Sequence, residues 1–492
     1  MARANSRIFP RSTCIVTGSP FLPMMLLSTG IASPCLARVR DRLDDTRIGS
    51  GLRNELSSGD RAAVPRRLAE LRGTDRARAA DRERKGPDMI TRFDSLYAGH
   101  VDMDDIGYGG TAVNSRVFPN EHLVTTFAKA RNLARLLDRC GYDTFWLAEH
   151  HFQREGYECI PNVLLLALDL AHQTQRLKMG CGFNITPMWH PLRLAEDFAS
   201  VDVLTGGRVR FGVGRGYHTR EVDTFGSPLL DQVANRELFE EQVEIIFKAF
   251  NNAAFSHEGK HYTIPARVPY RGYDLKDLTL VPRPVHPVEC WQPIQSATPR
   301  GLDFMAKHGI KGLIGGGVAE GGAMRGVIEA YRDANRRAGR ETELGEGLCI
   351  GFHFQLAATK EEAVKAAAGY FEENLKMFGP LRLVRSLSPE QIDVMADPKK
   401  APYAGLPTIE EAADRGAYLC GPPAQIIDTL MRLEKEYPGL ERVSVSHPMG
   451  ASESLMLEQL EWFATEVMPA FTRRSRSTGA WARDPSLPIE TD

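Results

Sequence analysis

Short apolar runs of strand length alternate with longer segments of helical period from residue 89 onward. The predicted strands are 90–97, 144–148, 177–185, 209–213, 291–296, 312–314, 348–356 and 442–446. The predicted helices are 122–140, 162–172, 191–204, 235–250, 301–307, 324–338, 360–377 and 423–436, with a closing helix over 452–470. This alternation predicts βα units that build a parallel sheet.

Eight strand–helix units predict an α/β fold, a (β/α)8 TIM barrel with insertions over residues 89–475. An open, doubly wound sheet is the alternative arrangement of the same units. Two stretches, 253–293 and 380–421, are too long for simple connections. The first predicts a hairpin with a proline-rich return and the second a polar loop, and we expect both to act as lids.

Residues 1–88 differ in composition from the rest of the chain. They carry 17 Lys and Arg against 10 Asp and Glu, with few aromatic residues, so they offer too little apolar surface to offset chain entropy. We expect this Arg-rich extension to be disordered, and a start of translation at Met89 is the favoured explanation of it. A natural disordered extension and a targeting segment are the alternatives. A flexible C-terminal tail is expected over 476–492.

The whole chain is nearly neutral, with 61 Lys and Arg, 63 Asp and Glu and a formal net charge of -2. We therefore expect no nucleic-acid partner and no attraction to an anionic membrane. The eight cysteines include no C-x-x-C pair, which favours reduced thiols in a cytoplasmic protein over a disulfide framework or a zinc ribbon. No run approaches the roughly 18 apolar residues of a membrane-spanning helix.

Polar side chains follow several predicted strands, at the end where such barrels carry their active sites. Glu149, His150 and His151 follow the second strand. Imidazole exchanges protons near neutral pH, so a histidine here is a candidate acid or base. Carboxylate and imidazole also bind zinc or iron, but strand alternation points His150 away from its two neighbours. We predict no metal site.

A second group of residues suggests a phosphorylated ligand. Arg215 lies between two glycines after the fourth strand; glycines let a ligand approach the backbone, and a guanidinium can hold a phosphate bidentately. Ser296, Ala297 and Thr298 precede the helix at 301, where hydroxyls and free N–H groups favour an anion.

Four motifs occur in a characteristic order: Trp146-Leu147-Ala148-Glu149-His150-His151-Phe152, His190-Pro191 with Ala195-Glu196-Asp197, Gly206-Gly207-Arg208, and Phe211-Gly212-Val213-Gly214-Arg215-Gly216. Together they resemble the bacterial luciferase-like flavin monooxygenases, a family of (β/α)8 barrels that use reduced FMN and oxygen. The resemblance runs from residue 89 to residue 471 and includes the closing Val467-Met468-Pro469.

The resemblance implies a role for each site residue. His150 matches a histidine assigned to catalysis beside the flavin, with Glu149 and His151 supporting that site. Arg215 and Ser296 match ligands of the FMN phosphate, and Gly182–Phe183 stands where the family has a non-prolyl cis peptide against the isoalloxazine ring. The residues expected to bind FMN are Gly182, Phe183, Asn184, Arg215, Gly216, Tyr217, Ser296 and Ala297.

The implied activity is a flavin-dependent monooxygenase. Reduced FMN from a separate NAD(P)H-dependent flavin reductase would react with O2 to a C4a-peroxide that oxygenates a small organic substrate. Because dimers are common in the family, we expect a homodimer. Light emission is not implied, since the segment after Ser296 and the pocket loops depart from the luciferase chains. The alternatives are an F420-dependent oxidoreductase of the same superfamily, a flavin-binding barrel without turnover, and a metal-dependent barrel hydrolase.

Overall fold

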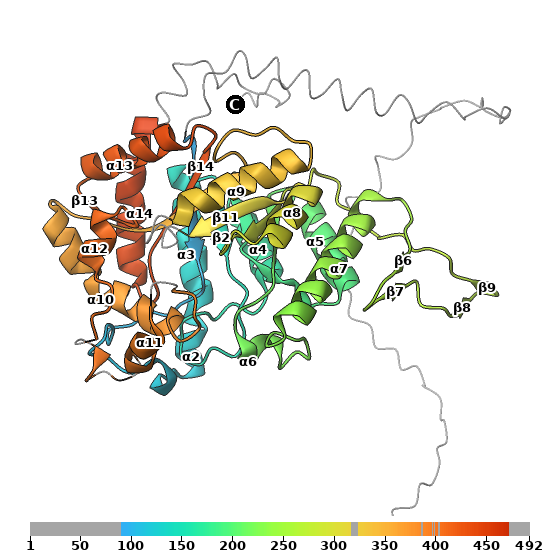
Figure 1. Cartoon of the computed structure of the whole chain (residues 1–492), viewed down its shortest axis with the longest axis horizontal. Helices are drawn as coiled ribbons and strands as arrows, with labels where there is room; N and C mark the ends of the chain where they lie inside the picture. Colours follow the sequence, from blue (N-terminus) through green and yellow to red (C-terminus); the bar gives the residue numbers. More distant parts are fainter. Residues whose placement is uncertain are drawn as a thin grey trace, which may run out of the picture. The chain divides into compact units, whose positions relative to one another are not determined.

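In the computed structural model, eight parallel strands form a closed ring in the order β1, β2, β3, β5, β10, β11, β12 and β14 (Figure 1). Their bounds are β1 Arg92–Tyr97, β2 Thr144–Leu147, β3 Lys178–Cys181, β5 Val209–Gly214, β10 Cys290–Pro293, β11 Lys311–Gly315, β12 Leu348–Leu356 and β14 Arg442–Ser446. Pairing of Cys290 with Phe211 and of Trp291 with Gly212 closes the ring. The predicted (β/α)8 barrel is confirmed, and the open sheet is wrong.

The structure describes residues 90–315, 323–384, 387–395, 397, 399–401 and 404–471. All of them belong to one compact unit, Asp75–Asp492. The predicted extension 1–88 and the predicted tail 476–492 lie outside the described residues.

Helices connect successive strands around the barrel. The main ones are α3 Thr125–Cys140, α4 Val163–His172, α5 Pro191–Thr205, α7 Gln232–Asn251, α8 Pro299–His308, α9 Ala323–Arg337, α10 Lys360–Phe378, α13 Pro423–Glu436 and α14 Glu453–Glu466. Shorter elements are η1 Val113–Ser115, α2 Asn120–Leu123, β4 Asn184–Ile185, η2 Thr186–Met188 and α6 Thr219–Val222. No helix of the described residues combines the length and apolar character needed to cross a bilayer.

Local signals in the sequence explain where these helices begin and end. The Asn162 side chain accepts from the Leu165 amide at the start of α4, and Asp231 caps the first turn of α7 in the same way. Gly141 and Gly206 end α3 and α5 with positive φ, a conformation that glycine adopts without a steric penalty. The predicted helix boundaries therefore agree with the structure to within a few residues.

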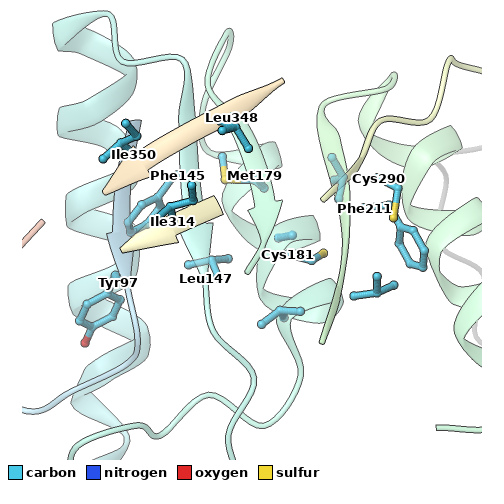
Figure 2. Packing of buried hydrophobic residues seen from close by; sticks show 14 of the residues in the cluster. Tyr97, Phe145, Leu147, Met179, Cys181, Phe211, Cys290, Ile314, Leu348 and Ile350 are labelled. Carbon is cyan, nitrogen blue, oxygen red and sulfur yellow. The ribbon is translucent and has the colours of Figure 1, made fainter. Parts of the chain in front are cut away.

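Alternate residues of each strand face opposite sides of the barrel wall. The outward residues pack against the helices; Figure 2 shows part of this layer, including Tyr97, Phe145 and Phe211. Inward residues fill the barrel, where Trp146 packs with Trp291, Phe183 and Cys349. An ideal Cβ on Gly180 would lie 2.2 Å from the Trp146 ring, so the absence of a side chain there makes room for the indole.

Charged side chains close the opposite, N-terminal end of the barrel. Arg442 Nη1 lies 2.6 Å from Asp94 and 2.7 Å from Asp143. Arg210 also bonds Asp143 at 3.0 Å, and Asp94 accepts from the Trp146 indole N–H at 2.9 Å. Opposite charges and hydrogen bonds thus satisfy these groups where the strands begin.

Two insertions interrupt the regular alternation. The first contains the predicted hairpin, formed by β6 His257–Glu258 and β7 Thr263–Ile264, and a second hairpin of β8 Pro269–Tyr270 and β9 Tyr273–Asp274. Figure 1 shows the second hairpin extending away from α7.

The second insertion differs from its prediction as a polar loop. It contains α11 Pro389–Met395, α12 Ile409–Asp414 and β13 Tyr418–Gly421. Strand β13 pairs with the C-terminal half of β12. The scattered apolar residues of this insertion, such as Leu387, Ile409 and Tyr418, form a second core with α10. Their spacing is too irregular to show a helical or strand period, which is why the sequence did not predict these elements.

Candidate active site at the strand ends

The predicted site residues come together at the C-terminal ends of neighbouring strands. Glu149, His150 and His151 follow β2, and Gly182, Phe183 and Asn184 follow β3. Arg215, Gly216 and Tyr217 follow β5, and Ser296 and Ala297 follow β10. Because these strands are parallel neighbours, all eleven residues lie at one end of the barrel.

Glu149 is buried and holds the surrounding backbone in place. Its Oε2 accepts from the Ile185 amide at 2.8 Å, and its Oε1 accepts from the Trp189 indole N–H at 2.8 Å. Oε1 also lies 3.2 Å from His151 Nε2. Glu149 thus links the end of β2 to the segment after β3, and both of its oxygens have protein partners.

His150 is buried between two carboxylates that the sequence analysis did not identify. Its Nδ1 lies 3.2 Å from Glu221 on α6, and its Nε2 lies 3.2 Å from Glu158 in the loop after β2. The Tyr217 hydroxyl oxygen is 2.9 Å from the same Nε2. Burial favours the neutral imidazole, but Glu158 and Glu221 outweigh it and raise the pKa of His150 above its ordinary value.

These groups belong to a larger buried network. Tyr217 donates to Glu158 Oε1 at 2.5 Å, and His218 Nε2 lies 2.9 Å from the other oxygen of Glu158. Gln153 donates to Glu221 at 3.0 Å. Glu158 lies in a loop and Glu221 in the short helix α6, so no apolar periodicity marks either acid in the sequence.

His150, Glu158 and His218 each offer one atom of a type that binds metal ions, all within 4.8 Å of one another. The Tyr217 hydroxyl contacts His150 and Glu158 at this same point. Hydrogen bonding therefore accounts for the grouping, and we assign no metal ion to it.

Arg215 lies where two helix N-termini meet beside β5. It bonds Asn235 Oδ1 through Nε at 2.8 Å and Gln232 through Nη2 at 3.0 Å, which fixes the guanidinium against the start of α7. Burial and then the nearby Arg236 charge lower the pKa of Arg215 to about 10. The Glu240 carboxylate acts on the pKa of Arg215 in the opposite direction, but within the described residues its ion pairs are with Arg236 and Arg300.

Arg215, Arg236 and the first turn of α8 form a group of cations and N–H donors, which we call the basic corner. The N-cap of α8, Thr298, makes no side-chain cap hydrogen bond, so the first turn keeps free N–H groups. Arg236 of α7, missed by the sequence analysis, is 3.3 Å from an ideal Cβ on Gly301 in that turn. Ser296 is half-buried and Ala297 exposed at the adjacent end of β10. A phosphate group fits this arrangement.

The segment after β3 has an irregular backbone. The Gly182–Phe183 peptide bond is cis and divides the single predicted strand 177–185 into β3 and β4. Asn184 donates to the Gly212 carbonyl at 2.8 Å, while its buried Oδ1 has no hydrogen-bond partner. Phe183 packs against Trp146 and Trp291. The unpaired amide oxygen of Asn184 thus lies beneath this irregular segment, at the end of the barrel that carries the other site residues.

Aromatic side chains flank the site on the solvent side. Phe152 is 53% exposed and stacks on Phe225 with a centroid distance of 5.6 Å. The His151 ring contacts the edge of Phe225 at 4.8 Å. The site thus has an apolar rim beside the buried polar network.

Known proteins similar to this chain include several monooxygenases. The alkanal monooxygenase alpha chain of the Kryptophanaron alfredi symbiont is 32% identical over 134 residues, 27% of this chain and 36% of that protein. The oxygenase component of the flavin-dependent trigonelline monooxygenase of Acinetobacter baylyi is 24% identical over 348 residues, 69% of this chain and 88% of that protein. The chain covers only 36 to 39% of the length of the first curated relatives.

A solved structure shares the fold. The oxygenating constituent of 3,6-diketocamphane monooxygenase from Pseudomonas putida, in complex with FMN, superposes with a TM-score of 0.56 at 21% identity, over 77% of this chain and 99% of that one. The family described as luciferase-like monooxygenase matches residues 108–438, which include the strand ends described above. The chain therefore belongs to the luciferase-like monooxygenase family.

Proposed function

We propose that this protein is a flavin-dependent monooxygenase that uses reduced FMN and O2 to oxygenate a small organic substrate. The observation that carries the proposal is the basic corner at Arg215, a fixed guanidinium beside the uncapped first turn of α8. Two relatives with longer alignments support the same activity. They are named trigonelline monooxygenase and limonene 1,2-monooxygenase, and each aligns with 69% of this chain.

In this proposal Arg215, Ser296 and the first turn of α8 would hold the phosphate of FMN, with Arg236 as a further cation. Gly182, Phe183, Asn184, Gly216 and Tyr217 would hold the isoalloxazine ring. Ala297, with its small side chain, would let the phosphate approach the backbone. When bound, the reduced flavin supplies the electrons that activate oxygen.

The chain's own residues orient the reactants and move protons. Glu149 fixes the backbone beneath the ring, because it bonds both the Ile185 amide and the Trp189 indole. His150 exchanges the proton that the reaction requires, and His151 supports the aromatic rim against Phe225. The rim and the inward aromatic layer exclude water from the site.

A separate reductase would supply the reduced flavin. The trigonelline relative is named as an oxygenase component, which implies a second component for that protein. We extend this arrangement to the present chain, and we also propose a homodimer in the cytoplasm, which analytical ultracentrifugation and localisation of a tagged chain would test.

Anaerobic titration of the full chain with reduced FMN, and separately with reduced F420, tests the proposal. We expect saturable binding of FMN, followed on mixing with oxygen by a slowly decaying flavin–oxygen absorbance. Binding of F420 alone, without a reaction with oxygen, would replace the monooxygenase by a hydride-transfer enzyme. Binding of FMN without oxygen consumption for any tested substrate would favour a flavin-binding barrel without turnover.

A further inference from the structure

The hydrogen bonds around His150 determine how many protons its ring carries. A neutral imidazole has one N–H group and one acceptor nitrogen. Nδ1 faces the Glu221 carboxylate at 3.2 Å, and an ionised carboxylate only accepts. Nδ1 therefore requires a hydrogen.

The other ring nitrogen requires a hydrogen as well. Nε2 faces Glu158 Oε1 at 3.2 Å and the Tyr217 oxygen at 2.9 Å. Tyr217 has one hydroxyl hydrogen, and the shorter 2.5 Å bond to Glu158 uses it. The phenol oxygen thus meets Nε2 as an acceptor, so each partner of Nε2 accepts and none donates.

Each of the two carboxylates has a further polar partner. Gln153 donates to Glu221 at 3.0 Å, and His218 Nε2 lies 2.9 Å from Glu158 Oε2. The His150 side chain is 5% exposed and those of Glu158 and Glu221 are 1% exposed. Two buried carboxylates without a cation would be strongly unfavourable, and a proton on the His150 ring between them would supply that cation.

We propose that Glu158 and Glu221 are positioning residues that hold His150 as a doubly hydrogen-bonded imidazolium, so that this histidine enters the reaction as a proton donor. The proposal rests on the proposed function and adds to it the protonation state of His150 and the two acids that set it. The proton from Nε2 would go to the oxygen atom that the proposed reaction releases as water. The Tyr217 hydrogen can then turn from Glu158 to Nε2, so that no ring nitrogen is left without a partner.

The titratable groups that face His150 within the described part of the chain are mostly acidic. They come from the end of β2, from the following loop, from the loop after β5 and from α6: Glu149, Glu158, Tyr217, His218 and Glu221. Three are carboxylates. The His218 ring is 5.3 Å away, at an interplanar angle of 85°, and its own bond is to Glu158. The pKa of Glu221 is held below its ordinary value, against the effect of burial, by its bond to His150.

The test is a histidine NMR titration of the full chain labelled with 15N in the imidazole rings, with His150→Gln identifying the resonances. We expect both ring nitrogens of His150 to stay protonated at and above pH 6.5. Glu158→Gln and Glu221→Gln should each lower the titration midpoint by about one pH unit or more, a tenfold loss of proton affinity.

Glu155→Gln is the matched control. Glu155 is buried in the same loop as Glu158, but it bonds the Arg220 guanidinium at 2.8 Å and does not contact His150. Its substitution should leave the His150 midpoint unchanged. The inference is wrong if His150 is neutral at pH 6.5 in the parent chain, or if Glu155→Gln shifts the midpoint as far as the other two variants.

A second variant covers the case in which the glutamine variants do not fold. Tyr217→Phe keeps both carboxylates and removes only the hydroxyl, so His150 should remain doubly protonated; a neutral ring in this variant would contradict the role of the acids. In turnover assays, Glu158→Gln and Glu221→Gln should lower kcat and leave the dissociation constant of FMN unchanged, whereas general damage to the site would alter both.

The NMR measurement needs no flavin, so the two proposals can fail separately. A charged His150 in a chain that binds no flavin would contradict the proposed function alone. A neutral His150 in a chain that binds reduced FMN and reacts with oxygen would contradict the present inference alone.

Discussion

At the scale of single residues, the Arg215 guanidinium is the group at the strand ends that is best placed to bind an anion. Arg215 is fixed by hydrogen bonds to Asn235 and Gln232, which both lie at the start of α7. The side chain is thus oriented before any ligand arrives, which reduces the entropy lost on binding.

Arg215→Ala should weaken FMN binding by roughly 10- to 100-fold, because it removes a charge-assisted hydrogen bond worth about 1.5–3 kcal/mol. Fluorescence titration of FMN measures the change. Arg193→Ala is the control, since Arg193 is exposed on α5 and pairs only with Glu196 and Asp197. Equal affinities of the parent chain and Arg215→Ala would exclude Arg215 as a phosphate ligand.

The buried His100 and His447 and the half-buried His353 should make the protein sensitive to acid. Burial, with smaller effects of His353 and Lys129, lowers the pKa of His447 to about 3. Burial lowers the pKa of His353 to about 4 and that of His100 well below its ordinary value. In the unfolded chain each histidine takes up a proton near pH 6.5. Their stabilising effect is therefore complete above pH 6.5 and is lost as the pH falls towards the folded pKa.

Between pH 6.5 and pH 5, His447 alone should account for about 2 kcal/mol of lost unfolding free energy. His447→Gln should remove that part of the pH dependence in urea unfolding at the two pH values. His261→Gln, on the exposed hairpin, should not. If the parent chain and His447→Gln lose stability equally, the histidine is not buried in its neutral form.

The sequence identified single residues well where a motif surrounded them. His150, Arg215 and Tyr217 lie at the strand ends, where the sequence predicted them. Glu158, Glu221 and Arg236 were not predicted, because each depends on a contact between segments far apart in the chain. A one-dimensional pattern records strand and helix periods, but it does not record which loops meet above them.

At the scale of elements, the close packing of β2 on β3 depends on a missing side chain. Gly180→Ala would place a Cβ 2.2 Å from the buried Trp146 ring, which cannot move without disturbing the aromatic layer. We expect a loss of about 1–3 kcal/mol of unfolding free energy, measured by denaturant unfolding.

Gly326→Ala provides the opposite case. Gly326 lies in α9 and a Cβ there would have no neighbour within 4 Å, so alanine should stabilise the chain by roughly 0.5–1 kcal/mol through helix propensity. Destabilisation by both substitutions would mean that the collision with Trp146 is not the cause of the loss.

Helix α10 is attached to the loop after β1 by buried charges. Glu373 accepts from Arg116 at 3.0 Å and from Lys376 at 2.9 Å, and it also bonds the Gly107 amide. Glu373→Ala leaves two buried cations without their carboxylate and should cost roughly 3–5 kcal/mol. Glu361→Ala, in the exposed first turn of the same helix, should cost less than about 1 kcal/mol.

Thermal unfolding would measure the stability of Glu373→Ala and Glu361→Ala, and limited proteolysis would measure how easily the loop after β1 is cleaved in each. Early cleavage in the loop after β1 is expected for Glu373→Ala only. If the two variants lose similar stability, the buried charges do not attach the loop to the helix.

Periodicity predicted elements where packing is regular. The eight barrel strands are short apolar runs and the helices between them have apolar residues three to four positions apart, so they were found in order. The insertion with α11, α12 and β13 was predicted as a loop because its apolar residues gain their order only by contact with α10. The break between β3 and β4 was likewise hidden inside one apolar run.

At the scale of the whole molecule, the first and last described strands are neighbours. β1 pairs with β14, and the Phe93 ring contacts Phe471 at a centroid distance of 5.5 Å. The Thr91 amide also donates to the Glu441 carbonyl at 3.0 Å. The ring of strands is therefore continuous across the point where the described chain begins and ends.

Far from that point, the hairpin of β8 and β9 turns through Arg271 and Gly272, and Gly272 has no heavy atom within 4 Å of an ideal Cβ. A circularly permuted gene could join residue 471 to residue 90 through a short linker and open the chain at this tip without separating any two paired strands of the barrel. The order of synthesis would change, and each strand would keep its neighbours in space. The order in which the strands are synthesised therefore does not determine which strands lie side by side in this barrel.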